Sequence, residues 1–186
     1  HWMLEEVGAP YRIVTLDMEK GQHKAPDFLA INPMGKLPAI VHHGVVVTET
    51  PAIIAYLADA FPAAGLAPAP GEPARGAYYR WLFFGAGCYE PAALEVVLGR
   101  APLEGRHRAM AGWGCHADVL ATLKAALAPG AFLLGDRFTA ADLYIGSELV
   151  WGMMMNVPGL KDEPVFDAYV ARLRERPAFR RSIGAS

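Results

Sequence analysis

Hydrophobic and polar positions follow two different spacings in the first third of the chain. Apolar residues at helical spacing over positions 2–7 predict a short helix that ends at Gly8. A β-rich run at 11–16 comes next, and a polar stretch then leads to a short helix around Phe28. Helical and strand-like segments that follow one another in this way predict a small mixed α/β unit.

A hairpin and a longer helix complete this unit. Two apolar runs, 39–41 and 45–48, flank a His-His-Gly turn and predict a pair of antiparallel strands. From Thr50 the apolar residues return at helical spacing until Pro62. The following segment is rich in Pro, Gly and Ala without apolar periodicity, which is typical of a linker between domains.

The remaining segments all have helical periodicity. One apolar stripe begins at Tyr78 and is expected to bend near Gly85 and Pro91, and a second stripe covers 110–127. Another helix, over 163–176, is expected to close at Pro177. No strand-like run interrupts this half, so an all-helical domain is predicted.

A further helix in this half has a sharp start signal. Thr139 and Asp142 have the spacing of a capping box. In such a box, each side chain accepts a hydrogen bond from the backbone N–H group of the other residue at the start of the helix. The sequence therefore predicts an α+β N-terminal domain over residues 1–62, a linker over 63–74 and an all-α domain over 75–186.

Composition and charge narrow the class of protein. The 186 residues are 53% hydrophobic and 19% charged, with a formal net charge of -2, which is ordinary for a globular protein with a real core. Lys and Arg form no basic patch that would suit nucleic acid or an anionic membrane. No apolar run is long enough to span a bilayer. We expect no nucleic-acid partner and no membrane partner.

The metal-binding residue types are scattered. Cys88 and Cys115 are the two cysteines, far apart in sequence and without a CxxC or Cys/His spacing around them. His42 and His43 fit the hairpin turn and have no further ligands nearby in sequence. The sequence predicts no metal site and no disulfide framework, which fits a reducing cytoplasm.

Two short stretches together suggest a ligand site. If the peptide bond before Pro38 is cis, the Leu37 backbone groups turn away from the sheet edge and can pair with an extended ligand. Thr50 can cap the next helix, whose free N–H groups favour a carboxylate. Each stretch alone also fits an ordinary strand start or a plain helix cap. Together they predict a site for a small acidic peptide.

Four stretches, taken in order, resemble the markers of the cytosolic glutathione transferase (glutathione S-transferase) family, bacterial type. They are "WMLEEVGAPY", "NPMGKLPAI", "VVTETPAIIAYLADAFP" and "FTAADLYI". The resemblance covers essentially the whole chain. It implies a thioredoxin-like N-terminal domain before the all-α domain, and a detoxification enzyme that conjugates the glutathione thiolate to small apolar electrophiles.

The resemblance also implies which residues bind glutathione. Leu37 and Pro38 would hold the cysteinyl segment through the backbone, and Glu49 and Thr50 would bind the γ-glutamyl end. Lys36 would pair with a carboxylate of the ligand, although a solvated loop lysine is an equally good interpretation.

Further candidates are implied at both ends of the site. His23 and Lys24 belong to the segment that contacts the glycyl end in the family. Tyr78, Trp81 and Cys88 are candidates for the electrophile pocket, with burial in the core as the alternative, because large residues at helical spacing are usually buried.

The remaining implications concern catalysis and assembly. In the family, the Ser, Tyr or Cys that activates the thiolate lies between the first strand and the first helix, so the catalytic residue is expected upstream of His1. Glutathione is a co-substrate, no cofactor is expected, and a cytoplasmic homodimer is implied. Two alternatives stay open: another glutathione-dependent enzyme (isomerase, peroxidase, dehalogenase or disulfide reductase), or a noncatalytic regulatory protein of the same fold.

Overall fold

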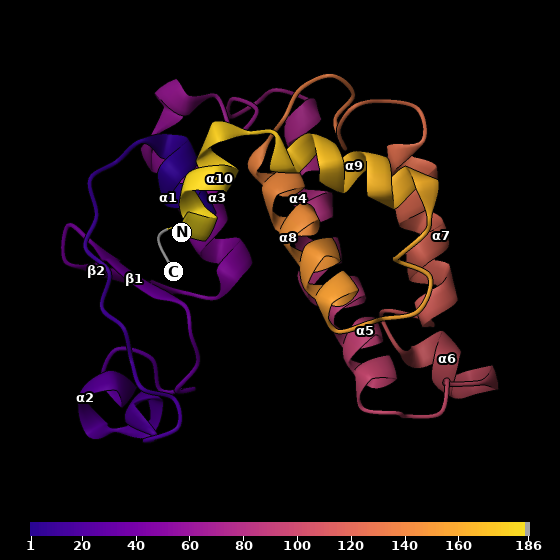
Figure 1. Cartoon of the computed structure of the whole chain (residues 1–186), viewed down its shortest axis with the longest axis horizontal. Helices are drawn as coiled ribbons and strands as arrows, with labels where there is room; N and C mark the ends of the chain where they lie inside the picture. The colour runs from indigo at the N-terminus through magenta and orange to yellow at the C-terminus, as the bar shows by residue number, and fades with distance from the viewer. Residues whose placement is uncertain (185–186) are drawn as a thin grey trace.

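The computed structural model describes residues 1–184 of the chain. Figure 1 shows the strands and short helices of the N-terminal third on one side and the longer helices on the other. The elements are α1 (Trp2–Val7), η1 (Gln22–Lys24), α2 (Pro26–Leu29), β1 (Ala39–His42), β2 (Val45–Thr48), α3 (Thr50–Ala60), η2 (Pro62–Ala64), α4 (Ala74–Phe84), η3 (Gly85–Tyr89), α5 (Glu90–Val97), α6 (Gly105–Met110), α7 (His116–Leu127), α8 (Ala140–Met154), α9 (Pro164–Arg174) and α10 (Pro177–Gly184).

The N-terminal part is built around an antiparallel hairpin. β1 and β2 pair from Ala39 opposite Thr48 to His42 opposite Val45. The two residues between the strands, His43 and Gly44, have φ angles of 49° and 79°. Positive φ at both positions is what a two-residue type I′ turn requires. The helix α3 packs against both strands, so the predicted α+β character of this part is confirmed.

Two sequence predictions about individual elements were wrong. The β-rich run at 11–16 has no regular secondary structure and is not a strand, because no neighbouring segment within residues 1–184 pairs with its backbone. The stripe at 110–127 is divided between α6 and α7. Gly114, with φ of 62°, lies in the break and takes a left-handed conformation that helices do not contain.

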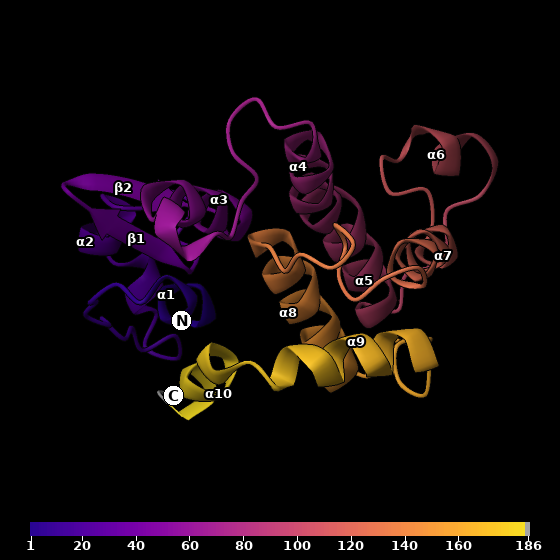
Figure 2. The same ribbon diagram turned by 90° about the horizontal axis from the view of Figure 1, so that it is seen from above.

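The C-terminal part is helical, and α8 lies at its centre. Figure 2 shows α8 beside α4, with α9 crossing one end of it and α7 farther away. α8 also contacts α3 of the N-terminal part. Its first two turns, residues 140–146, are buried all round, as expected for a helix segment inside a core. The helical nature of the second half is therefore confirmed, and none of the helices in residues 1–184 has the length and apolar character needed to cross a membrane.

The capping box predicted at Thr139 and Asp142 is present at the start of α8. The Thr139 N–H group donates to Asp142 Oδ2 over 2.9 Å. Both side chains are fully buried, and the Asp142 carboxylate also accepts hydrogen bonds from the Leu133 N–H group and the Tyr169 hydroxyl. The box therefore does more than start a helix, because it also fixes the preceding loop and α9.

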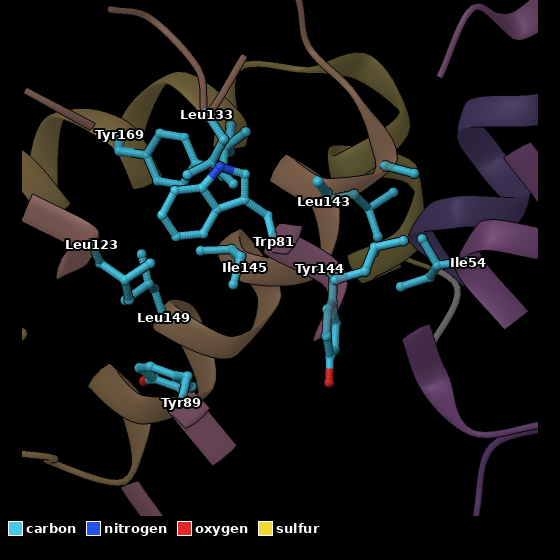
Figure 3. Packing of buried hydrophobic residues seen from close by; sticks show 14 of the residues in the cluster. Ile54, Trp81, Tyr89, Leu123, Leu133, Leu143, Tyr144, Ile145, Leu149 and Tyr169 are labelled. Carbon is cyan, nitrogen blue, oxygen red and sulfur yellow. The ribbon is translucent and has the colours of Figure 1, made fainter. Parts of the chain in front are cut away.

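One hydrophobic cluster joins the two parts of the chain. Figure 3 shows Ile54 of α3 facing Leu143 and Tyr144 of α8, with Trp81 and Tyr169 farther into the helical part. The last helix, α10, returns to pack on α1, and Figure 1 shows the two helices next to each other. The two parts are thus held together by a shared core and by the contact between the first and last helices.

Candidate functional site

A cleft of about 570 Å³ is lined by residues of both parts of the chain. The N-terminal side is polar at several points, whereas the helical side is mainly apolar. The lining residues are Asn32, Lys36, Leu37, Pro38, Glu49, Thr50, Pro51, Ala52 and Ala55 from the first side, and Tyr79, Leu82, Phe83, Ala86, Glu90 and Tyr144 from the second. Five of the sequence-predicted ligand residues (Lys36, Leu37, Pro38, Glu49 and Thr50) are therefore brought together.

A buried asparagine holds the loop before β1. Asn32 is only 3% exposed, its Nδ2 donates to the Lys36 carbonyl over 2.8 Å, and its Oδ1 accepts from the Met34 N–H group over 3.1 Å. The loop ends in a cis peptide bond between Leu37 and Pro38. Asn32 was not predicted from the sequence, although an Asn immediately before a Pro and a Gly-containing turn is a known signal for such a role.

Lys24 and His23 support the loop from behind rather than facing the cleft. The Lys24 ammonium donates to the Met34 carbonyl over 2.8 Å. His23 has a buried Nδ1 without a hydrogen-bond partner among the described residues. Gly35 has a φ of 59°, and a Cβ there would lie 2.7 Å from the His23 carbonyl oxygen. Neither His23 nor Lys24 is among the residues that line the cleft within residues 1–184.

The start of α3 faces the cleft through Glu49 and Thr50. Glu49 is the N-cap residue, with φ of 66° and no hydrogen bond from its side chain to the helix. The prediction that Thr50 is the N-cap was wrong by one position, because Thr50 already has a place inside the first turn. Within residues 1–184 the Thr50 hydroxyl makes no hydrogen bond. It can therefore donate to a bound anion, which the dipole at the start of the helix also stabilises.

The helical wall of the cleft differs from the predicted electrophile pocket. Tyr78 and Trp81 are 0% and 3% exposed and belong to the core. They point inward because they occupy the buried face of α4, while Tyr79 and Phe83 occupy the face toward the cleft. Leu82 and Ala86 complete this apolar wall, so the assignment of Tyr78 and Trp81 to the pocket is replaced by these neighbours.

Cys88 does not line the cleft, as far as residues 1–184 show. Its thiol donates to the Gly112 carbonyl at 3.5 Å, on the side of α6 and α7. Burial raises the pKa of the Cys88 thiol, which lowers the fraction of reactive thiolate. The described part of the chain also holds no group of three His, Cys, Asp or Glu side chains suited to a metal ion.

Two polar residues that sequence reasoning missed meet on the helical side of the cleft. The Tyr144 hydroxyl donates a hydrogen bond to Glu90 Oε1. Tyr144 is fully buried, and burial, followed by the bond to Glu90, raises the pKa of its hydroxyl. The hydroxyl therefore stays protonated and remains a donor. Glu90 is the first residue of α5, immediately after the π-helix η3, and an irregularity of this kind is frequent at functional sites.

Comparisons with known proteins agree with this geometry. Residues 1–59 match the family model of the glutathione S-transferase N-terminal domain. Glutathione S-transferase 3 of Zea mays is 32% identical, over 98% of this chain and 86% of that protein. Glutathione S-transferase GstA of Escherichia coli O157:H7 is 29% identical, over 100% of this chain and 91% of that protein.

Solved structures give the same result. A sphingomonad glutathione S-transferase complexed with glutathione superposes with a TM-score of 0.80 and 32% identity, over 100% of this chain and 91% of that one. BphK, a bacterial transferase solved as a ternary complex, gives a TM-score of 0.81 at 27% identity. The thioredoxin-like N-terminal domain and the helical C-terminal domain are thereby confirmed, and the chain belongs to the cytosolic glutathione transferase family of enzymes.

Proposed function

We propose that the cleft binds glutathione and that the enzyme conjugates its thiolate to a small electrophile with an apolar body. One observation carries the proposal: a single cleft combines the backbone at Leu37 and Pro38, the start of α3 at Glu49 and Thr50, and the apolar wall of α4. A tripeptide with charged ends and a central thiol needs the first two features, and an apolar electrophile needs the third.

Each part of glutathione has a complementary group in the cleft. The γ-glutamyl carboxylate suits the Thr50 hydroxyl and the N–H groups at the start of α3, and the γ-glutamyl ammonium suits the Glu49 carboxylate. The cysteinyl backbone suits the exposed N–H and C=O groups of Leu37. Lys36 offers a cation for a ligand carboxylate. His23 and Lys24 act indirectly in this proposal, by holding the loop that contains Met34 and Gly35.

The chemistry is attack of a thiolate on carbon. A carbon–sulfur bond forms, and either a leaving group departs with its electron pair or a π pair shifts to a neighbouring atom that then takes a proton. A free thiol with a pKa of about 8.5 is mostly protonated at neutral pH, so a donor to the thiolate raises the rate. We expect a Ser, Tyr or Cys side chain to supply this donor.

Several finer predictions belong to this proposal. The glutathione-binding domain covers 1–62, the linker 63–74 and the helical domain 75–186. The enzyme acts in the cytoplasm as a homodimer in which one subunit's first domain meets the other's second. Light scattering across a concentration series tests the dimer, which a monomeric mass at all concentrations would exclude.

Calorimetric titration with glutathione tests the proposed function itself. We expect saturable binding at one site per chain, and turnover with at least one member of a panel of aryl halides and isothiocyanates. Absence of glutathione binding would overturn the proposal. Binding without turnover across the panel would instead favour a noncatalytic regulatory protein.

A further inference from the structure

Glu90 is an exposed carboxylate on an otherwise apolar wall. It lines the cleft beside Phe83 and Ala86, and it is the one charged residue that the helical side contributes to the lining within residues 1–184. The other charged lining residues, Lys36 and Glu49, lie on the side proposed for glutathione. A second substrate that occupies the apolar wall would therefore meet the Glu90 side chain.

Tyr144 fixes the orientation of this carboxylate. Its hydroxyl donates to Glu90 Oε1, and its ring is fully buried. Figure 3 shows the Tyr144 hydroxyl directed away from the other labelled core side chains. The ring lies against the backbone of Gly85, where a Cβ atom would come within 2.5 Å of Tyr144 Cε1. A glycine at the start of the π-helix thus makes room for the ring that positions Glu90.

The Glu90 carboxylate keeps unused acceptor capacity. A carboxylate offers about four acceptor positions, and the bond from Tyr144 is the single hydrogen bond that this side chain makes within residues 1–184. The local potential is negative, because the charge of Glu90 itself reaches the neighbouring Glu148 and the charge of Glu49 reaches Tyr144. A donor or a cation is therefore favoured at this point, and an anion is disfavoured.

We infer that Glu90 determines the specificity of the proposed conjugation, by accepting a hydrogen bond from a donor group, best a cationic ammonium, on an otherwise apolar electrophile. Tyr144 is the positioning residue that keeps the carboxylate turned toward the cleft. This inference rests on the proposed function, because it assigns the second-substrate half of the same cleft. It narrows the substrate class from apolar electrophiles to amphipathic ones.

Binding of inert reaction products tests the inference without requiring turnover. Three S-benzylglutathione conjugates would be titrated by calorimetry into the full chain, with an aminomethyl, a methyl or a carboxylate group at the para position. At neutral pH we expect the aminomethyl conjugate to bind about tenfold more tightly than the methyl conjugate, as hydrogen bonds to charged groups allow. The carboxylate conjugate should bind most weakly.

Variants assign the preference to Glu90. Glu90→Gln removes the charge and should reduce the ratio of aminomethyl to methyl affinity by about tenfold. Tyr144→Phe keeps the ring against Gly85 but removes the donor, and should reduce the ratio by a smaller factor. Glu175→Gln makes the same charge change at an exposed position outside the cleft and should leave the ratio as in the wild type.

The outcomes separate the inference from the proposed function. Equal affinities of the aminomethyl and methyl conjugates, or a ratio that Glu90→Gln does not change, would overturn the role of Glu90 while leaving glutathione binding intact. Failure of the chain to bind glutathione itself would overturn both. Thermal unfolding of each variant shows that it is folded, and the Tyr144→Phe result tests Glu90 independently of any damage by the first substitution.

Discussion

Arg176 and Glu6 join the two ends of the chain through two parallel hydrogen bonds. Arg176 Nε lies 2.6 Å from Glu6 Oε1 and Nη2 lies 2.8 Å from Oε2, across 170 positions of sequence. The guanidinium carbon is 3.5 Å from the centre of the Phe138 ring. Glu6 also accepts a hydrogen bond from Trp2 Nε1 over 2.8 Å. The pair therefore ties α1, the loop before α8 and the start of α10 together.

Removing one partner of this pair should destabilise the fold. The Glu6 side chain is 8% exposed and that of Arg176 is 30% exposed, so Glu6→Ala leaves the partly buried Arg176 side chain without its partner. We expect a loss of about 2–4 kcal/mol in the free energy of unfolding, measured by urea denaturation. Arg176→Lys should lose less, because it keeps the charge while giving up the paired geometry.

A matched arginine substitution provides the control for this prediction. Arg100 is exposed, and its side chain has no hydrogen bond or ion pair within residues 1–184. Arg100→Ala should change the free energy of unfolding by no more than about 0.5 kcal/mol. If Glu6→Ala is as mild as Arg100→Ala, the pair does not hold the two ends together.

Asp142 is expected to matter for stability rather than for ligand affinity. Its carboxylate accepts from the Leu133 N–H group at 2.7 Å, the Thr139 N–H group at 2.9 Å and the Tyr169 hydroxyl at 3.0 Å. Asp142→Ala leaves these buried donors without an acceptor, so we expect a loss of about 3–5 kcal/mol in the free energy of unfolding. Affinity for glutathione, measured well below the melting temperature, should stay near that of the wild type.

The neighbouring Asp136 offers a control for Asp142. It is exposed, and its side chain has no partner within residues 1–184. The free energy of unfolding of Asp136→Ala should therefore lie within about 0.5 kcal/mol of the wild-type value. Weaker glutathione binding by a folded Asp142→Ala protein would contradict a purely structural role.

Thr50 is expected to show the opposite behaviour. Its hydroxyl has no hydrogen bond within the described chain and faces the cleft. Thr50→Ala should raise the dissociation constant for glutathione by about tenfold, because a hydrogen bond to an ionised carboxylate is lost. The free energy of unfolding should change by about 0.5 kcal/mol or less. Calorimetry measures the first effect and urea denaturation the second.

Thr122→Ala is the matched control for Thr50. Thr122 lies on α7, outside the cleft, and its hydroxyl donates to the Asp118 carbonyl over 2.8 Å. We expect its substitution to leave the glutathione dissociation constant within about twofold of the wild type, because no ligand contact is lost. If Thr50→Ala binds glutathione like Thr122→Ala, Thr50 does not contact the ligand.

Local signals in the sequence predicted the hairpin, the capping box and several of the residues that line the N-terminal side of the cleft. These features depend on residues close together in sequence, such as His43 with Gly44 or Thr139 with Asp142. The run at 11–16 was mistaken for a strand because β-propensity does not reveal whether a partner strand is available. A local pattern can predict that a segment favours a strand. Whether that segment pairs with another strand depends on segments that are distant in sequence.

The helical side of the cleft was harder to predict for the same reason. Tyr78 and Tyr79 are neighbours of the same type, and only the packing of α4 on α8 decides that Tyr78 is buried while Tyr79 faces the cleft. Glu90 and Tyr144 are 54 positions apart, and no spacing rule connects them. Their contact depends on how the π-helix directs the start of α5 toward α8.

Glu148 should make the stability of the fold depend on pH. Burial, and secondly the charge of Glu90, raise the pKa of the Glu148 carboxyl from its ordinary value of 4.5 to about 8. Tyr144 and Tyr89 are the other titratable groups that its charge reaches, and both are phenols that stay neutral in this range. The carboxyl of Glu148 is therefore the group that changes charge here between pH 4.5 and 8.

The direction of the pH dependence follows from the proton that the Glu148 carboxyl retains in the folded state. Below pH 4.5 Glu148 is protonated in both states, so its stabilising contribution is fully present. Between pH 4.5 and 8 the unfolded chain releases the proton and the folded chain keeps it, so stability falls as pH rises, by at most about 1.4 kcal/mol per pH unit. Above pH 8 both states are ionised and the contribution is lost.

Comparison with Glu148→Gln isolates this contribution. The glutamine is neutral at every pH, so the wild type should lose about 2–4 kcal/mol relative to the variant between pH 5 and pH 8.5, measured by urea denaturation. Glu175→Gln alters an exposed carboxyl, so its free energy of unfolding should change with pH as that of the wild type does. Glu90→Gln should reduce the pH dependence only in part, because burial is the larger cause of the shift. A Glu148→Gln curve parallel to that of the wild type would show that Glu148 is ionised in the folded protein at neutral pH.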